Sequence, residues 1–203
     1  MINEDETKLD HEASKVGSRF EEALIFATQK HNGQTRKKSE IPYISHVLSV
    51  TALVLEAGGD GDQAIAAALH DVVEDCGGAP VLAEIRERFG ERVARIVEGC
   101  TDTDQIPKPP WRARKEDYLR HLKEAGEDVR LVSAADKLHN VRSIVADYRD
   151  VGEAVWERFA GRRDGTLWYY RAVLEILLLG PGSRLIGELE RSVLELEHLT
   201  KRP

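Results

Sequence analysis

Four ionisable side chains follow one another closely at the end of an apolar segment: His70, Asp71, Glu74 and Asp75. The segment is rich in alanine, a strong helix former, and we predict one helix over residues 64–76. Positions four apart share a helix face, so the last two carboxylates would lie over His70 and Asp71. Burying such groups without partners costs about 2–7 kcal/mol for a neutral polar group and more for a charge. A bound metal ion is the compensation that this pattern indicates.

Two further candidate ligands lie in other apolar segments. His46 on its own could be a core histidine that is hydrogen-bonded to a carbonyl. Asp136 is a stronger candidate, because a buried aspartate is rare unless it binds a metal or pairs with a cation, here Lys137 or Arg142. The candidate ligand set is therefore His46, His70, Asp71 and Asp136. Two imidazoles and two carboxylates suit Mn, Fe or Zn rather than an all-oxygen Mg or Ca site. Such an ion would lower the pKa of a water molecule and polarise a phosphoryl oxygen.

Helices must position these residues, because no part of the sequence alternates apolar and polar residues long enough to form a strand. Ser18 and Glu21 form a capping-box pattern at the start of the first helix. Loops are predicted over residues 33–42, which are basic, and over 101–110, which contain three prolines. The further predicted helices cover about 44–57, 64–76, 80–89, 90–99, 111–124, 127 onwards, 152–160, 165–179 and 184–199. The predicted fold class is all-α.

The chain divides into three parts. Residues 1–17 are polar, without an apolar stripe, and are predicted to be a flexible N-terminal arm. Residues 18–180 form the main helical domain. Residues 181–203 contain a helix with an apolar stripe, which must pack either on the domain or in the interface of a homo-oligomer.

The composition excludes several classes of protein. The net charge of −7 over 203 residues argues against a nucleic-acid-binding protein with a basic face. No run of about 20 apolar residues is present, so we expect no transmembrane helix. The sequence also lacks a signal-peptide pattern, and its two cysteines are too few for a disulfide framework. We therefore expect a cytoplasmic protein.

Three motifs carry a resemblance to a known family: Arg36-Lys37 with Ile41-Pro42-Tyr43-Ile44-Ser45-His46, then His70-Asp71-Val72-Val73-Glu74-Asp75, then Asp136-Lys137-Leu138-His139-Asn140. Together they resemble the hydrolase domain of Rel/Spo-type alarmone enzymes and, more closely, the stand-alone small alarmone hydrolases of the HD superfamily. The resemblance covers about residues 18–175. It implies an HD-domain helical bundle over 18–180, an Mn²⁺ ion, and removal of the 3′-pyrophosphate from guanosine tetra- or pentaphosphate.

The resemblance also assigns roles to positions. It implies that the metal ligands are His46, His70, Asp71 and Asp136. It implies that Glu74 and Asp75 are the catalytic pair that orients or deprotonates the attacking water. The substrate-binding positions that it implies are Arg36, Lys37, Asn140 and, from the aromatic run of residues 168–170, Tyr169. The chain departs from the pattern at Cys76, where relatives favour threonine, and in an insertion over residues 150–164.

Two features leave alternatives open. A second basic cluster, residues 108–115, contains Arg114, which could clamp substrate phosphates or belong to a solvated charged helix.

The function could also be that of an HD-type nucleotide phosphatase, including one that removes the 2′-phosphate of NADPH. A third alternative is a non-catalytic HD module that binds a nucleotide. In each case the partner is a small-molecule nucleotide.

Overall fold

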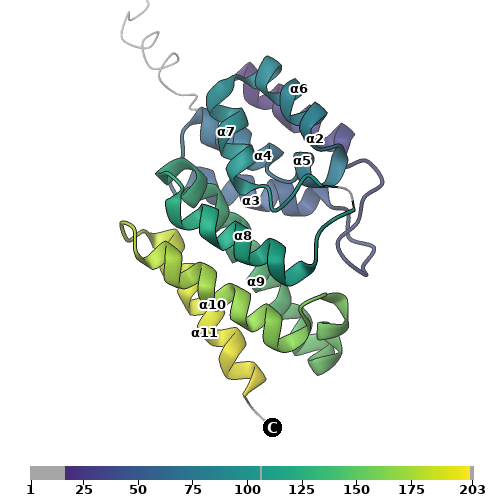
Figure 1. The fold of residues 1–203 in the computed structure, drawn as a ribbon, viewed down its shortest axis with the longest axis vertical. Helices are drawn as coiled ribbons and strands as arrows, with labels where there is room; N and C mark the ends of the chain where they lie inside the picture. The colour runs from purple at the N-terminus through teal and green to yellow at the C-terminus, as the bar shows by residue number, and fades with distance from the viewer. Residues whose placement is uncertain (1–16, 106, 202–203) are drawn as a thin grey trace, which may run out of the picture.

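The structure is a computed structural model that describes residues 17–105 and 107–201. These residues are helical, apart from loops and one isolated antiparallel bridge between Thr35 and Pro42, so the predicted all-α fold is confirmed (Figure 1). The predicted arm over 1–17 lies outside the described residues except for its last residue. No helix in the described ranges is long and apolar enough to cross a membrane. The elements are α2 (Ser18–Lys30), α3 (Ile44–Glu56), α4 (Gly61–Leu69), α5 (Val72–Cys76), α6 (Ala79–Phe89), α7 (Glu91–Cys100), α8 (Trp111–Glu124), α9 (Glu127–Val151), the 3₁₀ helix η1 (Gly152–Arg158), α10 (Arg162–Leu178) and α11 (Arg184–Thr200).

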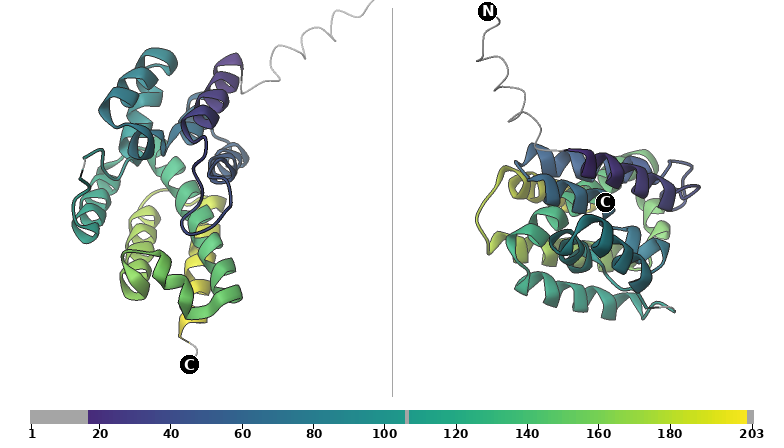
Figure 2. Two further views of the ribbon diagram at one scale, coloured as in Figure 1. Left: turned by 90° about the vertical axis from the view of Figure 1, so that its right-hand side faces the viewer. Right: turned by 90° about the horizontal axis from the view of Figure 1, so that it is seen from above.

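The 25-residue helix α9 runs through the molecule and joins its two halves (Figures 1 and 2). It contacts α3, α4 and α7 in the N-terminal half, and η1, α10 and α11 in the C-terminal half. All seven residues from 132 to 138 are buried, so the helix is covered on every side at that point. Asp136 and Lys137 therefore lie in the interior, where a charged side chain needs a partner.

The helix predicted over residues 64–76 is interrupted, because α4 ends at Leu69 and α5 begins at Val72. In a continuous helix, neighbouring residues point about 100° apart and do not face each other. At the break, the Asp71 carboxylate turns back, so that its Oδ2 lies 2.9 Å from Nε2 of His70. The prediction of one helix is wrong: helix propensity is a local signal, and it does not include the contacts of Asp71 with Tyr43 and His46 that accompany the break.

A capping box is present at α4 rather than at α2. The Asp60 side chain accepts a hydrogen bond from the backbone N–H of Gln63 (3.0 Å), and the Gln63 side chain accepts one from the backbone N–H of Asp60 (2.8 Å). The box predicted at Ser18 is wrong, because Gly17 is the N-cap residue of α2 and Ser18 is already helical. The start of α4 is therefore fixed by its own sequence.

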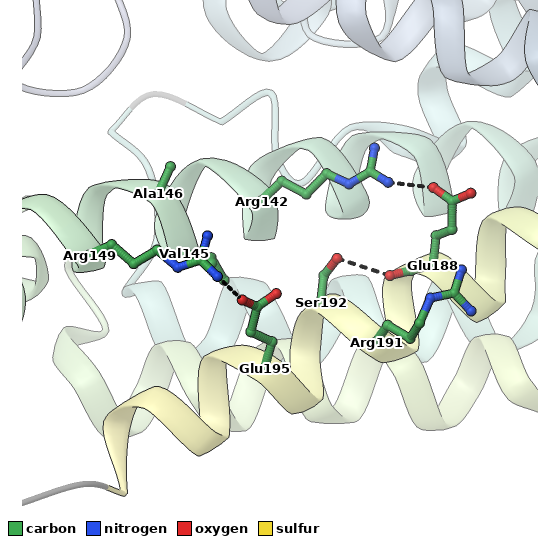
Figure 3. A pocket seen from close by; sticks show the side chains of 8 residues that line it. All are labelled: Arg142, Val145, Ala146, Arg149, Glu188, Arg191, Ser192 and Glu195. Carbon is green, nitrogen blue, oxygen red and sulfur yellow. Dashed lines mark hydrogen bonds and ion pairs between the residues drawn. The ribbon is translucent and has the colours of Figure 1, made fainter.

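Helix α11 packs its apolar stripe on α9 and α10. The buried residues of this stripe are Leu185, Leu189, Val193 and Leu196. Beside it, α9 and α11 form a groove of about 420 Å³ (Figure 3). Two ion pairs cross this groove, Arg142–Glu188 and Arg149–Glu195. Arg142, one of the two partners considered for Asp136, is therefore engaged elsewhere.

Truncation after Gly182 is expected to prevent stable folding. Burying a large apolar side chain contributes about 1.5–3 kcal/mol, so four contribute about 6–12 kcal/mol, which is comparable with the stability of a whole domain. Thermal unfolding and size-exclusion chromatography measure the effect. Leu189→Ala should cost about 2–5 kcal/mol, whereas Leu194→Ala, at a position 47% exposed on the same helix, should change little. A truncated protein with an unchanged Tm and size would show that α11 is dispensable.

Candidate metal centre and active site

The four predicted metal ligands meet at the junction of α3, the α4–α5 break and α9. Nε2 of His46 lies 3.2 Å from Nε2 of His70 and 3.2 Å from Oδ1 of Asp136. Oδ2 of Asp71 lies 3.4 Å from Nε2 of His46. His46, His70 and Asp136 are buried, and their nearest donor atoms all lie within 4.8 Å of one another. The structure thus brings together residues that are up to 90 positions apart in the sequence.

The second nitrogen of each imidazole has its own partner. Nδ1 of His70 lies 2.8 Å from the carbonyl oxygen of Ala67, to which it donates a hydrogen bond. Nδ1 of His46 lies 2.7 Å from Nδ1 of His139. Burial, and then the neighbouring His46, lower the pKa of His139 to about 4, so a neutral His139 can accept the hydrogen bond from His46. The Nε2 atoms of the two rings then lie 3.2 Å apart, and both can serve as ligands when neither carries a proton.

This donor set fits a divalent cation. Two facing nitrogen lone pairs 3.2 Å apart repel each other unless a positive charge lies between them. Burial alone would lower the pKa of His70, but the Asp71 carboxylate outweighs burial and raises this pKa to about 9. The cluster therefore attracts positive charge. Two imidazoles held by outer hydrogen bonds, with two carboxylates, form a ligand set that suits Mn, Fe or Zn.

Asp136 is held by two residues of its own helix. Its Oδ2 forms a buried ion pair with Nζ of Lys137, and its Oδ1 accepts a hydrogen bond from the Asn140 amide. Burial would raise the pKa of Asp136, but Lys137 and the histidines hold it well below its usual range. Both interpretations of Asp136 from the sequence are therefore present in the structure, since it pairs with Lys137 and also faces the histidines. The rings of Tyr118 and Tyr169 lie 4.8 Å and 5.9 Å from Nζ of Lys137.

Arg36 and Asn140, two of the predicted substrate-binding residues, lie together. The Arg36 guanidinium donates to Oδ1 of Asn140 over 2.7 Å, although the two residues are 104 positions apart. The loop that carries Arg36 is closed by the bridge between Thr35 and Pro42 and by the hydrogen bond from the Arg36 N–H to the Ile41 carbonyl. Lys37 is exposed in this loop.

Tyr43 is a site residue that the sequence did not single out. Its hydroxyl donates a hydrogen bond to Oδ2 of Asp71, the oxygen that faces both imidazoles. Burial, and then the charge of Asp71, raise the pKa of Tyr43 above its usual value, so the hydroxyl stays protonated and remains a donor. Its place in the Ile-Pro-Tyr-Ile-Ser-His motif is the signal that could have identified it.

The acidic pair lies beside the cluster and is held by other residues. Oε1 of Glu74 lies 2.9 Å from Nζ of Lys108, and Oδ2 of Asp75 accepts a hydrogen bond from the Gln34 amide over 2.8 Å. The prediction that Asp75 lies one helical turn past Asp71 is confirmed, because the Asp75 N–H bonds to the Asp71 carbonyl over 3.0 Å. Glu74, by contrast, does not continue the helix of His70, since α4 ends before the break and α5 begins after it.

The basic side chains of the second cluster are held by acidic and aromatic neighbours. Arg114 pairs with Asp102, and its NH1 lies 4.0 Å from Oε1 of Glu74. Lys115 also pairs with Asp102, whereas Arg112 stacks on the Trp168 ring, 3.3 Å from its centre. Arg114 and Lys115 are only 14% and 18% exposed, so they do not lie on a freely solvated helix face.

Tyr169 lies in the interior beside the basic cluster. Its ring is 4.8 Å from Nζ of Lys115, and its hydroxyl is buried without a hydrogen-bond partner among the described residues. Burial, only partly offset by Lys137, keeps the pKa of this hydroxyl well above its usual value. A buried hydroxyl without a partner leaves one hydrogen bond to be made, by water or by a ligand.

The helical fold and the His/Asp cluster together define an HD-domain protein. The sequence profile of the HD domain matches residues 23–167, which is more than half of the chain. The chain therefore belongs to the HD-domain family, and the predicted helical bundle of this family is confirmed.

Two enzymes and one solved structure are similar to more than half of this chain. A guanosine-3′,5′-bis(diphosphate) 3′-pyrophosphohydrolase of Aquifex aeolicus is 39% identical over 145 residues, which are 70% of this chain but only a fifth (20%) of that protein. The enzyme of the same name from Xenopus tropicalis, MESH1, is 40% identical over 126 residues, 61% of this chain and 68% of that protein. The solved structure described as "A metazoan ortholog of SpoT hydrolyzes ppGpp and plays a role in starvation responses" matches with a TM-score of 0.74 and 29% identity, and covers 89% of this chain and 96% of that one.

Proposed function

We propose that this chain is a divalent-cation-dependent guanosine-3′,5′-bis(diphosphate) 3′-pyrophosphohydrolase, with Mn²⁺ as its ion. The observation that carries the proposal is that donor atoms of His46, His70, Asp71 and Asp136 come together. The Nε2 atom of each histidine lies within 3.8 Å of an oxygen of each carboxylate. The names of the relatives from Aquifex and Xenopus support the substrate and the reaction. Hydrolysis at the 3′ position breaks the bond between the 3′-oxygen and phosphorus, and releases pyrophosphate.

These four residues would hold the cation, and Tyr43 and Lys137 would orient the two carboxylates. When bound, the cation supplies positive charge that polarises phosphoryl oxygens and makes water more acidic. The basic and amide groups around it would bind the nucleotide: Arg36, Lys37, Arg114, Asn140 and Tyr169. Arg36 can present a planar fork of donors to phosphate oxygens once it releases Asn140.

Glu74 and Asp75 would accept the proton of the attacking water. Both carboxylates are partly exposed, at 20% and 24%, so a water molecule can reach them. Lys108 lies 2.9 Å from Glu74 and 3.9 Å from Asp75, and it keeps the two carboxylates together in spite of their like charges.

A nucleotide panel tests the function. Purified protein loaded with Mn²⁺ is incubated with guanosine tetraphosphate, guanosine pentaphosphate, NADPH and GTP, and the products are separated and identified. Release of pyrophosphate from the first two is the expected result. Phosphate from NADPH alone would favour an HD-type phosphatase, and binding without turnover would favour a non-catalytic nucleotide-binding module.

Chelation provides an independent prediction. Removal of the ion by EDTA should abolish turnover and lower the Tm, because a ligand at 100 times its Kd stabilises the native state by about 2.7 kcal/mol. Adding back Mn²⁺, Fe²⁺ or Zn²⁺ separately then identifies the preferred ion. His70→Ala should bind no ion by elemental analysis, whereas His121→Ala, at an exposed position of α8, should bind it fully. An unchanged Tm after complete removal of metal would contradict the metal site.

A further inference from the structure

Asp102 links three groups of the proposed site, although neither the sequence motifs nor the comparisons assign it a role. Its side chain is only 5% exposed. Its Oδ2 accepts hydrogen bonds from NH1 of Arg114 and, over 3.0 Å, from Nζ of Lys115. Its backbone N–H donates to Oε2 of Glu74 over 3.4 Å. One residue therefore contacts Glu74 and two members of the basic cluster.

Arg114 has two carboxylates within reach. Its NH1 is bonded to Asp102 and lies 4.0 Å from Oε1 of Glu74, at the outer limit of an ion pair. Its Nε donates to the Pro109 carbonyl over 3.1 Å, which fixes the guanidinium at this place. Glu74 already pairs with Lys108. A shift of about 1 Å would bring Arg114 into a full ion pair with Glu74, since such pairs have N···O distances of about 2.7–2.9 Å.

We propose that Asp102 is a positioning residue that holds Arg114 and Lys115 off Glu74, so that the Glu74 carboxylate remains available to the attacking water. The proposal deepens the proposed function and rests on it, because it takes Glu74 as the group that accepts the proton. The contacts of Asp102 are with Glu74, Arg114 and Lys115, and none of these is a proposed metal ligand. Asp102 acts through the position of Arg114.

The charged groups around Asp102 support the proposal. Burial, and then the charge of Lys137, lower the pKa of Lys115, while Asp102 and Glu74 oppose this effect. Lys115 is thus a half-buried cation that needs a carboxylate, and Asp102 is the one to which it is bonded. The second oxygen of Asp102, Oδ1, is buried without a partner among the described residues. A buried carboxylate with one oxygen unpaired is costly for stability alone, which favours a role in function.

The test is a double-mutant cycle on turnover of guanosine tetraphosphate. In Asp102→Asn, Arg114 is expected to move onto Glu74, and kcat should fall about tenfold or more, as for other groups that orient an active-site residue. The KM should change less than kcat. Arg114→Gln should mainly raise KM, because it removes a phosphate contact. Asp104→Asn, an exposed aspartate of the same loop, is the matched control and should leave both parameters unchanged.

The double variant Asp102→Asn/Arg114→Gln distinguishes a positioning role of Asp102 from a purely structural role. Its kcat should recover to about that of Arg114→Gln alone, because the cation that blocks Glu74 is gone. A purely structural role of Asp102 would instead give a double variant at least as slow as the slower single variant, and this result would overturn the proposal. If Asp102→Asn does not fold, Asp102→Ser, which also removes the charge and leaves room for water, takes its place.

A crystal structure of the Asp102→Asn variant gives a readout that does not depend on the substrate. The distance from Arg114 NH1 to Glu74 Oε1 should shorten from 4.0 Å to hydrogen-bonding range. An unmoved Arg114 would overturn the proposal even if the enzyme hydrolyses guanosine tetraphosphate. Conversely, wild-type protein that acts on another nucleotide would refute the proposed substrate, while a moved Arg114 would still support the role of Asp102.

Discussion

Replacing Asp136 by asparagine is expected to remove the bound cation and to lower the hydrolysis rate about 10³-fold, since a metal ion contributes several kcal/mol and each 1.4 kcal/mol is a factor of ten. The Asp136 Oδ1 atom lies 3.2 Å from Nε2 of His46, at the centre of the proposed ligand set. An amide oxygen carries no charge and is a weaker ligand than a carboxylate. Elemental analysis and turnover measure the two effects.

The same substitution should also destabilise the fold. Lys137 would remain buried without its carboxylate, and breaking a buried ion pair costs about 3–5 kcal/mol. The double variant Asp136→Asn/Lys137→Met removes both charges, so it should regain stability but still bind no metal. This comparison separates loss of the ion from loss of the fold. Full metal content in Asp136→Asn would exclude Asp136 from the ligand set.

Replacing Glu74 by glutamine is expected to lower kcat about 10²–10⁴-fold, the usual contribution of a general base. Glutamine keeps the size and shape of the side chain but cannot accept a proton. Metal content and substrate affinity should be nearly unchanged, because the partners of Glu74 are Lys108 and the Asp102 N–H rather than the histidines. This pattern marks the loss of an interaction made only in the transition state.

The control for this change is Glu87→Gln, at an exposed position of α6, which should behave as wild type. A wild-type rate in Glu74→Gln would rule out Glu74 as the general base. Loss of metal from the same variant would give Glu74 a structural role and would leave Asp75 as the candidate base.

The sequence predicted the limits of a helix well where the residues that start or stop it lie next to it in the chain. The predicted limits of α8, residues 111–124, agree with the structure, because the prolines before Trp111 exclude an earlier start. The break after Leu69 could not be predicted from propensity, because alanine-rich segments favour a continuous helix. The contacts that accompany the break, from Tyr43 and His46 to Asp71, come from 25 or more positions away.

The candidate site likewise contains residues that the sequence could predict and residues that only the structure reveals. The His/Asp cluster of the candidate site could be predicted because histidine and aspartate are unusual in apolar helices, so their residue type alone is informative. Two of the residues that hold them, Tyr43 and His139, could not be assigned a role in this way, whereas Lys137 was one of the two cations considered as partners of Asp136. Tyrosine and histidine have many roles, and only the tertiary contacts of Tyr43 with Asp71 and of His139 with His46 distinguish these two.

The buried Lys137 has a consequence for the attraction of substrate. Asp71 and Asp136 bring two negative charges to the centre, which would cancel those of a divalent ion. The Lys137 ammonium, paired with Asp136 in the interior, adds one positive charge that solvent does not screen. The loaded centre would therefore carry a net charge of about +1, by simple addition of the ligand and ion charges. In a chain whose net charge is −7, this positive centre would attract a polyanionic nucleotide to the site.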